Sequence, residues 1–302
     1  MLKGEISYSA GAMSRNTDLE VCIDVIRDAG FKVTDFWLWK YSNPDGPMCQ
    51  ENWREWVKYV KEKLDAAGIR VGQVHALWDH DNQISEDYSY DLPRQVFHDS
   101  FEACAMLGSR RLIFHPIERW FPMADDSGRQ KVLDANIEWY KALIPSAEKW
   151  GVELHIENLF DHQHIFQPGD PVFPGSTPED ILYIINGIGS PLAKACLDSG
   201  HANIAGQDVP RMIRMYADKL GSLHLNDNYG KIGPIYEDLH LCPSYGRLPW
   251  KDIFEALEEI GYEDTLNMEV NAEIPKIPIP LRVIQLRTAI EVMNTMRELY
   301  GK

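Results

Sequence analysis

Imidazole and carboxylate side chains follow six consecutive runs of β-forming residues in this 302-residue chain. Both groups bind divalent cations, and both can exchange a proton near neutral pH. Burying them without partners would cost roughly several kcal/mol each, and nothing about folding requires them at every run end. The pattern therefore predicts a metal site, provided that the fold brings the run ends together. The residues are His75, His115, Glu157, Asp198, His201, His224, Asp238, His240 and Glu269.

The types of these side chains narrow the choice of metal. No cysteine is among them, and a set of nitrogen and oxygen ligands suits Zn²⁺, Mn²⁺, Co²⁺ or Mg²⁺, with the imidazoles favouring Zn²⁺ or Mn²⁺. One ion cannot use all nine groups. The sequence is therefore compatible with two or three ions, or with some groups that orient ligands or contact a substrate.

The segment CLDSGHANIAG (196–206) sets Asp198 and His201 three residues apart among small side chains. These small neighbours predict that both side chains turn toward a shared ion. His155 lies two residues before Glu157 on the same strand face, which predicts an interior packing residue. The loop histidines His162 and His164 are expected to face solvent.

Short β-forming runs alternate with amphipathic helical patterns along the whole chain. Eight such units predict an α/β fold of one domain over residues 1–302, a closed (β/α)8 TIM barrel whose strand ends meet at one rim. The alternative, an open doubly wound sheet, would show a glycine-rich turn after its first strand, and SYSAGAMSRN is not one. The predicted strands are 4–9, 33–39, 69–76, 111–116, 152–158, 193–199, 221–227 and 265–271. The predicted helices are 17–29, 50–67, 93–107, 129–149, 177–186, 208–219, 250–260 and 280–299, with Thr177 as an N-cap and Pro178 at the first helical position.

Composition excludes several classes of protein. A formal charge of −16 argues against a nucleic-acid partner, because phosphate binding needs a basic face. There is neither a secretory signal nor an apolar run of about 18 residues, so we expect a cytoplasmic protein without a membrane partner. Five widely spaced cysteines predict reduced thiols. The oligomeric state is left open, a homo-oligomer included.

The chain resembles the xylose isomerase-like TIM barrel superfamily, which includes sugar phosphate isomerases and epimerases and endonuclease IV (AP endonuclease family 2). The likeness covers nearly the whole chain and is most specific in HIEN, CLDSGHANIAG, LHLNDN, EDLHLCPSYGRLPW and NMEV. It implies a metal-dependent sugar isomerase or epimerase acting on a small carbohydrate. In similar ketose 3-epimerases one divalent ion is held from strands 5 to 8, which falls here on Glu157, Asp198, His224 and Glu269. The substrate-binding histidine of that group falls on His201.

The endonuclease IV pattern places nine ligands around three zinc ions, and all nine positions are filled here. They add His75, His115, His201, Asp238 and His240 to the four ligands of the epimerase pattern. After Glu157, however, NLFDHQH is bulky and acidic where the endonuclease pattern has small residues. The epimerase pattern is also incomplete, because Gly230 replaces an expected arginine and Gln163 an expected glutamate.

The resemblance implies a mechanism in which the metal polarises a carbonyl and the neighbouring hydroxyl. Glu157 and Glu269 would be the catalytic residues that remove and return a proton through a cis-enediolate. Trp78, Trp120 and Phe160 could stack on a sugar face. The alternatives are phosphodiester hydrolysis of the endonuclease IV type, a keto-sugar lyase of the same superfamily, and a carbohydrate-binding role without catalysis.

Overall fold

The computed structural model describes residues 2–43, 45–77, 91–116, 126–161, 173–230, 237–270 and 274–301. Eight parallel strands form one sheet in the order β7-β6-β5-β4-β3-β2-β1-β8. Seven strands fall inside the ranges predicted for them, β7 begins one residue before its predicted range, and the α/β class is confirmed. The strands are β1 Ile6–Ser9, β2 Val33–Trp37, β3 Arg70–His75, β4 Arg111–Phe114, β5 Glu153–Glu157, β6 Ala193–Asp198, β7 Leu220–His224 and β8 Leu266–Met268.

The sheet closes into a barrel just beyond the end of β7. Leu225 pairs with Met268 in a parallel bridge. The Leu225 N–H donates to the Asn267 carbonyl at 2.8 Å, and the Glu269 N–H donates to the Leu225 carbonyl at 3.1 Å. The closing hydrogen bonds therefore lie at the strand ends that carry the predicted chemistry.

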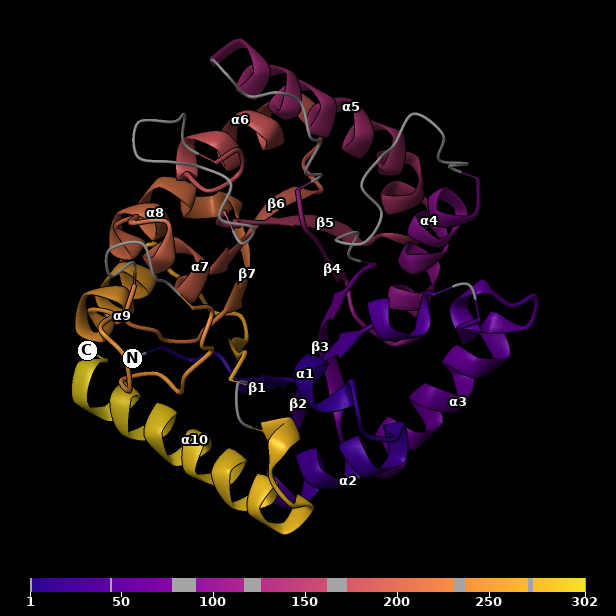
Figure 1. The fold of residues 1–302 in the computed structure, drawn as a ribbon, viewed down its shortest axis with the longest axis vertical. Helices are drawn as coiled ribbons and strands as arrows, with labels where there is room; N and C mark the ends of the chain where they lie inside the picture. The colour runs from indigo at the N-terminus through magenta and orange to yellow at the C-terminus, as the bar shows by residue number, and fades with distance from the viewer. Residues whose placement is uncertain are drawn as a thin grey trace.

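Helices surround the strands in a ring (Figure 1). The Arg297 guanidinium on the last helix donates to the Gly4 carbonyl at 2.9 Å, which holds the two ends of the chain together. Among the described helices, none combines the length and apolar character needed to cross a membrane. The helices that alternate with the strands are α2 Leu19–Ala29, α3 Trp53–Ala66, α4 Asp91–Met106, α5 Asp126–Trp150, α6 Pro178–Ile188, α8 Val209–Tyr216, α9 Trp250–Glu259 and α10 Ile279–Tyr300.

Two short helices were not predicted, and both lie at the rim of the barrel. These are α1 Gly11–Ser14 after β1 and α7 Ser199–Ile204 directly after β6. Neither is long enough to show the periodicity by which a helix is recognised in sequence. Three 3₁₀ turns, Trp39–Tyr41, Pro47–Cys49 and Ile274–Lys276, were missed for the same reason, and a fourth, Ala217–Lys219, forms the end of the helix predicted over 208–219.

His155 shows how a polar side chain is accommodated inside the barrel. His155, predicted to be an interior residue, is fully buried on β5. Its Nδ1 lies 2.8 Å from the Ser222 hydroxyl and its Nε2 lies 3.1 Å from the Glu153 carboxylate. A Cβ on Gly221 would come within 2.4 Å of the His155 ring, so glycine leaves the room that this imidazole occupies.

The start of α6 gives a direct test of the helix assignment. The Thr177 hydroxyl accepts from the Asp180 N–H at 3.2 Å, and Pro178 fills the first helical position as predicted. We expect Thr177→Ala to lower the free energy of unfolding by about 1 kcal/mol, because a helix-end N–H loses its acceptor. Chemical denaturation measures this loss. Thr177→Ser keeps the hydroxyl and is the control, and equal losses in both variants would contradict the capping role.

Candidate metal centre at the barrel mouth

The nine predicted side chains fall into three groups whose candidate ligand atoms lie within 4.8 Å of one another, and a further group, Glu157, Cys196 and His224, adds a cysteine that was not predicted as a ligand. Glu157 belongs to two of the three groups and joins them, and its Oε1 lies 3.3 Å from His201 Nδ1 of the remaining group. The first group is His75, His115 and Glu157, the second is Glu157, Asp198, His224 and Glu269, and the third is His201, Asp238 and His240.

The second group combines four strand ends that are far apart in the chain. All four side chains are buried, and His224 is fully enclosed. Its Nδ1 lies 3.1 Å from Glu157 Oε1 and 3.1 Å from Glu269 Oε2. This Nδ1 makes no hydrogen bond of good geometry within the described part of the chain. Burial acts to lower the pKa of His224, but the carboxylates outweigh it and raise the pKa, so a divalent cation that binds here would replace the proton on Nδ1 and offset the charge of three carboxylates.

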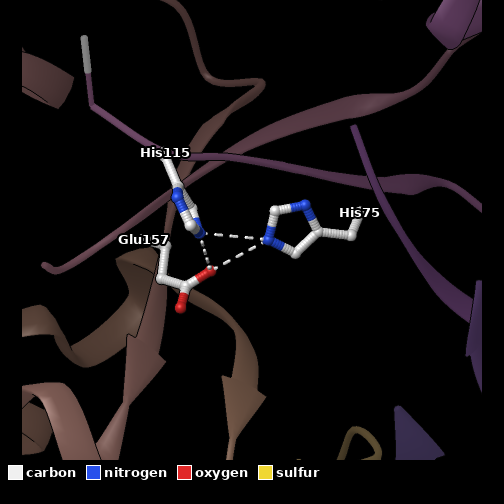
Figure 2. A group of neighbouring side chains, drawn as sticks. All are labelled: His75, His115 and Glu157. Atoms are coloured by element: carbon white, nitrogen blue, oxygen red, sulfur yellow. Dashed lines mark hydrogen bonds and ion pairs between the residues drawn. The ribbon is translucent and has the colours of Figure 1, made fainter. Parts of the chain in front are cut away.

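The first group sets two imidazoles against one carboxylate oxygen (Figure 2). His75 Nε2 lies 3.2 Å from His115 Nε2, and Glu157 Oε2 lies 3.4 and 3.3 Å from these two nitrogens. His75 Nδ1 is 3.0 Å from the Ala76 carbonyl, which can only accept, so Nδ1 carries the proton. In the neutral ring the His75 Nε2 lone pair therefore points into the group, as it does in a metal ligand.

The third group depends on a loop as well as on a helix. Asp238 Oδ2 lies 2.7 Å from His240 Nε2 and 3.5 Å from His201 Nε2. His240 Nδ1 donates to the Glu269 carbonyl at 2.9 Å, which joins the loop to the end of β8. His240 has a backbone φ of 43°, a left-handed conformation that is uncommon outside glycine.

Buried charges give the two glutamates opposite pKa shifts. Burial alone would raise the pKa of Glu157, but the positive charge of His224 and hydrogen bonding from His115 and His201 outweigh burial and hold the pKa well below its usual value. Burial raises the pKa of Glu269 to about 7, although His224 and His240 oppose the rise. Divergent pKa values in neighbouring carboxyl groups are typical of paired acid and base catalysts.

The pKa values of two histidines in the centre also shift in opposite directions. Burial lowers the pKa of His115 to about 4, so this ring is neutral at pH 7 and can donate a lone pair to a metal. Burial also acts to lower the pKa of His240, but the Asp238 carboxylate outweighs it and raises the pKa to about 10. Metal binding to His240 would therefore release a proton.

Asp198 and His201 lie close together, with His201 Nδ1 3.8 Å from Asp198 Oδ1 and 3.3 Å from Glu157 Oε1. Asp198 is the N-cap of α7, and its Oδ1 accepts from the His201 N–H at 2.7 Å. The His201 Nδ1 donates to the Asn158 carbonyl at 3.0 Å, and its Nε2 faces Asp238 and the third group. The two ligand atoms therefore belong to different groups.

Two asparagines, Asn158 in HIEN and Asn226 in LHLNDN, hold Asp198 in its orientation. The Asn158 amide donates to the Asp198 carbonyl at 3.0 Å and accepts from its N–H at 2.9 Å. The Asn226 amide donates to Asp198 Oδ2 at 2.9 Å. Gly200 must lack a side chain, because a Cβ would lie 1.9 Å from Asn226 Oδ1. HIEN and LHLNDN therefore contain the groups that orient a candidate ligand as well as the ligands themselves.

The aromatic contacts of the centre differ from those expected. Phe160 packs against the His201 ring at 5.1 Å, and Trp37, which was not predicted, packs against His75 at 4.8 Å. A Cβ on Gly11 would meet the Trp37 ring at 2.2 Å, so the rim needs glycine there. The predicted sugar contacts Trp78 and Trp120, and the loop residues His162, Gln163 and His164, lie outside the described residues.

Asp227 anchors the loop that carries the third group. This fully buried carboxylate accepts from the backbone N–H groups of Arg247 and Leu248 at 3.0 and 3.2 Å, and from the Trp250 indole at 2.7 Å. The backbone of Asp227 also pairs in both directions with Leu241. Asp227 was not predicted as a functional residue. It stands between Asn226 and Asn228, and nothing in the sequence distinguishes its role from theirs.

We expect Asp227→Ala to loosen residues 237–248, since several buried donors lose their acceptor at about 1–3 kcal/mol each. Hydrogen exchange in this loop should accelerate, while exchange in α6 stays unchanged. Asp227→Asn retains one acceptor oxygen and should show a smaller effect. Equal protection of the loop in wild type and Asp227→Ala would contradict the anchoring role.

Comparison with known proteins identifies relatives of this chain. A family model described as xylose isomerase-like TIM barrel matches residues 23–296. A D-psicose 3-epimerase of Enterocloster bolteae is 35% identical over 94 residues, or 31% of this chain and 28% of that protein. An uncharacterized protein of Methanocaldococcus jannaschii is 26% identical over 216 residues, covering 70% of this chain and 68% of the relative. The aligned part of the epimerase is therefore well under two thirds of its length.

Solved structures show the same fold over almost the whole chain. The IOLI protein with a bound zinc atom superposes with a TM-score of 0.75 at 15% identity, covering 99% of this chain and 100% of that one. A D-psicose 3-epimerase crystallised in the presence of D-fructose gives a TM-score of 0.73 at 18% identity, with the same coverage.

Proposed function

This chain belongs to the xylose isomerase-like TIM barrel family, and we propose that it is a metal-dependent sugar isomerase or epimerase. The observation that carries the proposal is the convergence of Glu157, Asp198, His224 and Glu269 on one buried position. Relatives named D-psicose 3-epimerase, inosose isomerase and putative hydroxypyruvate isomerase support this class of reaction. The substrate is a small carbohydrate, and we favour one without a phosphate group.

Asp198 and His224 would hold the ion with the two glutamates, and Zn²⁺ or Mn²⁺ suits this ligand set better than Mg²⁺ or Co²⁺. When bound, the cation supplies Lewis-acid polarisation of a substrate carbonyl and its neighbouring hydroxyl. The other two ligand groups have the composition to hold further ions, so the proposal extends to more than one metal per chain.

The glutamates would carry the proton. Glu157, whose pKa lies well below its usual value, is ionised and can remove a proton from the carbon next to the carbonyl. The electron pair left on that carbon moves toward the carbonyl oxygen. Glu269, whose pKa is about 7, can return a proton and restore the carbonyl. His201 would donate a hydrogen bond to a substrate oxygen.

We expect Glu157→Gln and Glu269→Gln to fold normally and to lose turnover by at least about 100-fold, because general acid–base catalysis contributes roughly that factor. The assay is a panel of sugars in D₂O with added Zn²⁺ or Mn²⁺, with deuterium incorporation read by mass spectrometry. Thr177→Ser is a control distant from the centre, and chelation should abolish incorporation in wild type. Near-normal rates in both glutamine variants would exclude the scheme.

Phosphodiester hydrolysis of the endonuclease IV type is a second candidate, because the nine side chains form three ligand groups where an epimerase needs one. The formal charge of −16 favours the sugar reaction, since binding to a DNA backbone releases counterions from phosphates near basic side chains.

We therefore expect abasic DNA to remain intact when it is incubated with zinc-loaded protein at low salt. A denaturing gel measures strand cleavage, with His115→Ala as the matched variant. Cleavage that depends on zinc and on His115 would favour the hydrolase over the isomerase.

A further inference from the structure

Asp35 is a charged residue in the middle of β2, fully buried inside the barrel. Its Oδ2 accepts from His224 Nε2 at 3.1 Å, across the barrel from its own strand. Among the described residues, Asp35 forms its ion pair with His224. Burying a carboxylate costs free energy of folding unless the charge is paired and hydrogen-bonded.

Amide groups hold the carboxylate in a fixed orientation. The Gln73 side chain donates to Asp35 Oδ2 at 3.1 Å and to the Leu223 carbonyl at 3.3 Å. The Asn267 amide donates to the same oxygen at 3.3 Å, and Asn267 itself accepts from the Ser7 hydroxyl at 2.6 Å. Side chains from β1, β2, β3 and β8 therefore converge beneath the imidazole on β7.

The contact fixes the tautomer of His224. A carboxylate only accepts, so Nε2 must carry the proton that it donates to Asp35. In the neutral ring the lone pair is then on Nδ1, the atom that lies 3.1 Å from both Glu157 and Glu269. An imidazole that donates one N–H to a carboxylate is oriented to bind a metal through its other nitrogen, and becomes a stronger ligand.

We propose that Asp35 is a positioning residue for the metal centre, acting through His224. This inference rests on the proposed metal site and names a residue that the strand-end pattern does not contain. Its role is separate from catalysis, since within the described part of the chain the side-chain hydrogen bonds and the ion pair of Asp35 reach the ligand groups through His224.

The test compares the zinc affinity of the full-length wild type, Asp35→Asn and Ser222→Ala by competition with a chromophoric chelator. Asp35→Asn keeps the size of the side chain but accepts more weakly, and its amide can donate to Nε2, which would place the proton on Nδ1. We expect its zinc affinity to fall 10- to 100-fold. Ser222→Ala removes another buried hydrogen bond of the barrel interior, and we expect wild-type affinity.

A second measurement does not depend on the folding of Asp35→Asn. In zinc-loaded wild type labelled with ¹⁵N-histidine, His224 should show a protonated Nε2 and a metal-shifted Nδ1, assigned from the signals lost in His224→Gln. Protonation of Nδ1 would overturn the proposal. Zinc affinity equal to wild type in Asp35→Asn, or a loss matched by Ser222→Ala, would overturn the role of Asp35 alone. A wild type that binds no zinc would overturn this inference together with the proposed function.

Discussion

A single buried carboxylate, Glu157, connects the parts of this centre. Its Oε1 faces His224 and His201, while its Oε2 faces His75 and His115. An enclosed carboxylate would normally become neutral, because burial disfavours the charged form. Here the surrounding imidazoles hold its pKa low, so the charge survives in the barrel interior. The arrangement is stable only while cationic partners, protons or metal ions, stay next to it.

The barrel explains how such a cluster can form. Parallel strands place their carboxyl ends at one rim, so residues far apart in the chain meet there without any local signal between them. Asp198 and His224 are direct neighbours in the register of β6 and β7. The strands also supply the rigidity that a set of like charges needs, because the ladder of the sheet fixes the backbones of His75, Glu157, Asp198 and His224.

Much of the fold and of the site could be predicted from the sequence. The residues that could not be predicted share one feature. The strands were recognised from β-branched and aromatic runs, and the ligand candidates from their place at the run ends. Asp35, Trp37 and Asp227 were missed, because their roles come from contacts between elements that no spacing along the chain encodes. Asp35 did leave one trace, a charge inside an otherwise buried strand, which is costly unless something pairs with it.

The three ligand groups lie on different kinds of backbone element. The groups around Glu157 stand mainly on strand ends, whereas Asp238 and His240 depend on a loop held by Asp227. Strand-borne side chains keep their geometry with or without a ligand, which suits the site where a proton must move between fixed atoms. The position of the third group is set instead by the contacts of Asp227 and by the hydrogen bond from His240 to the Glu269 carbonyl. The two kinds of support meet at Glu269, whose side chain belongs to the central group and whose carbonyl holds the loop.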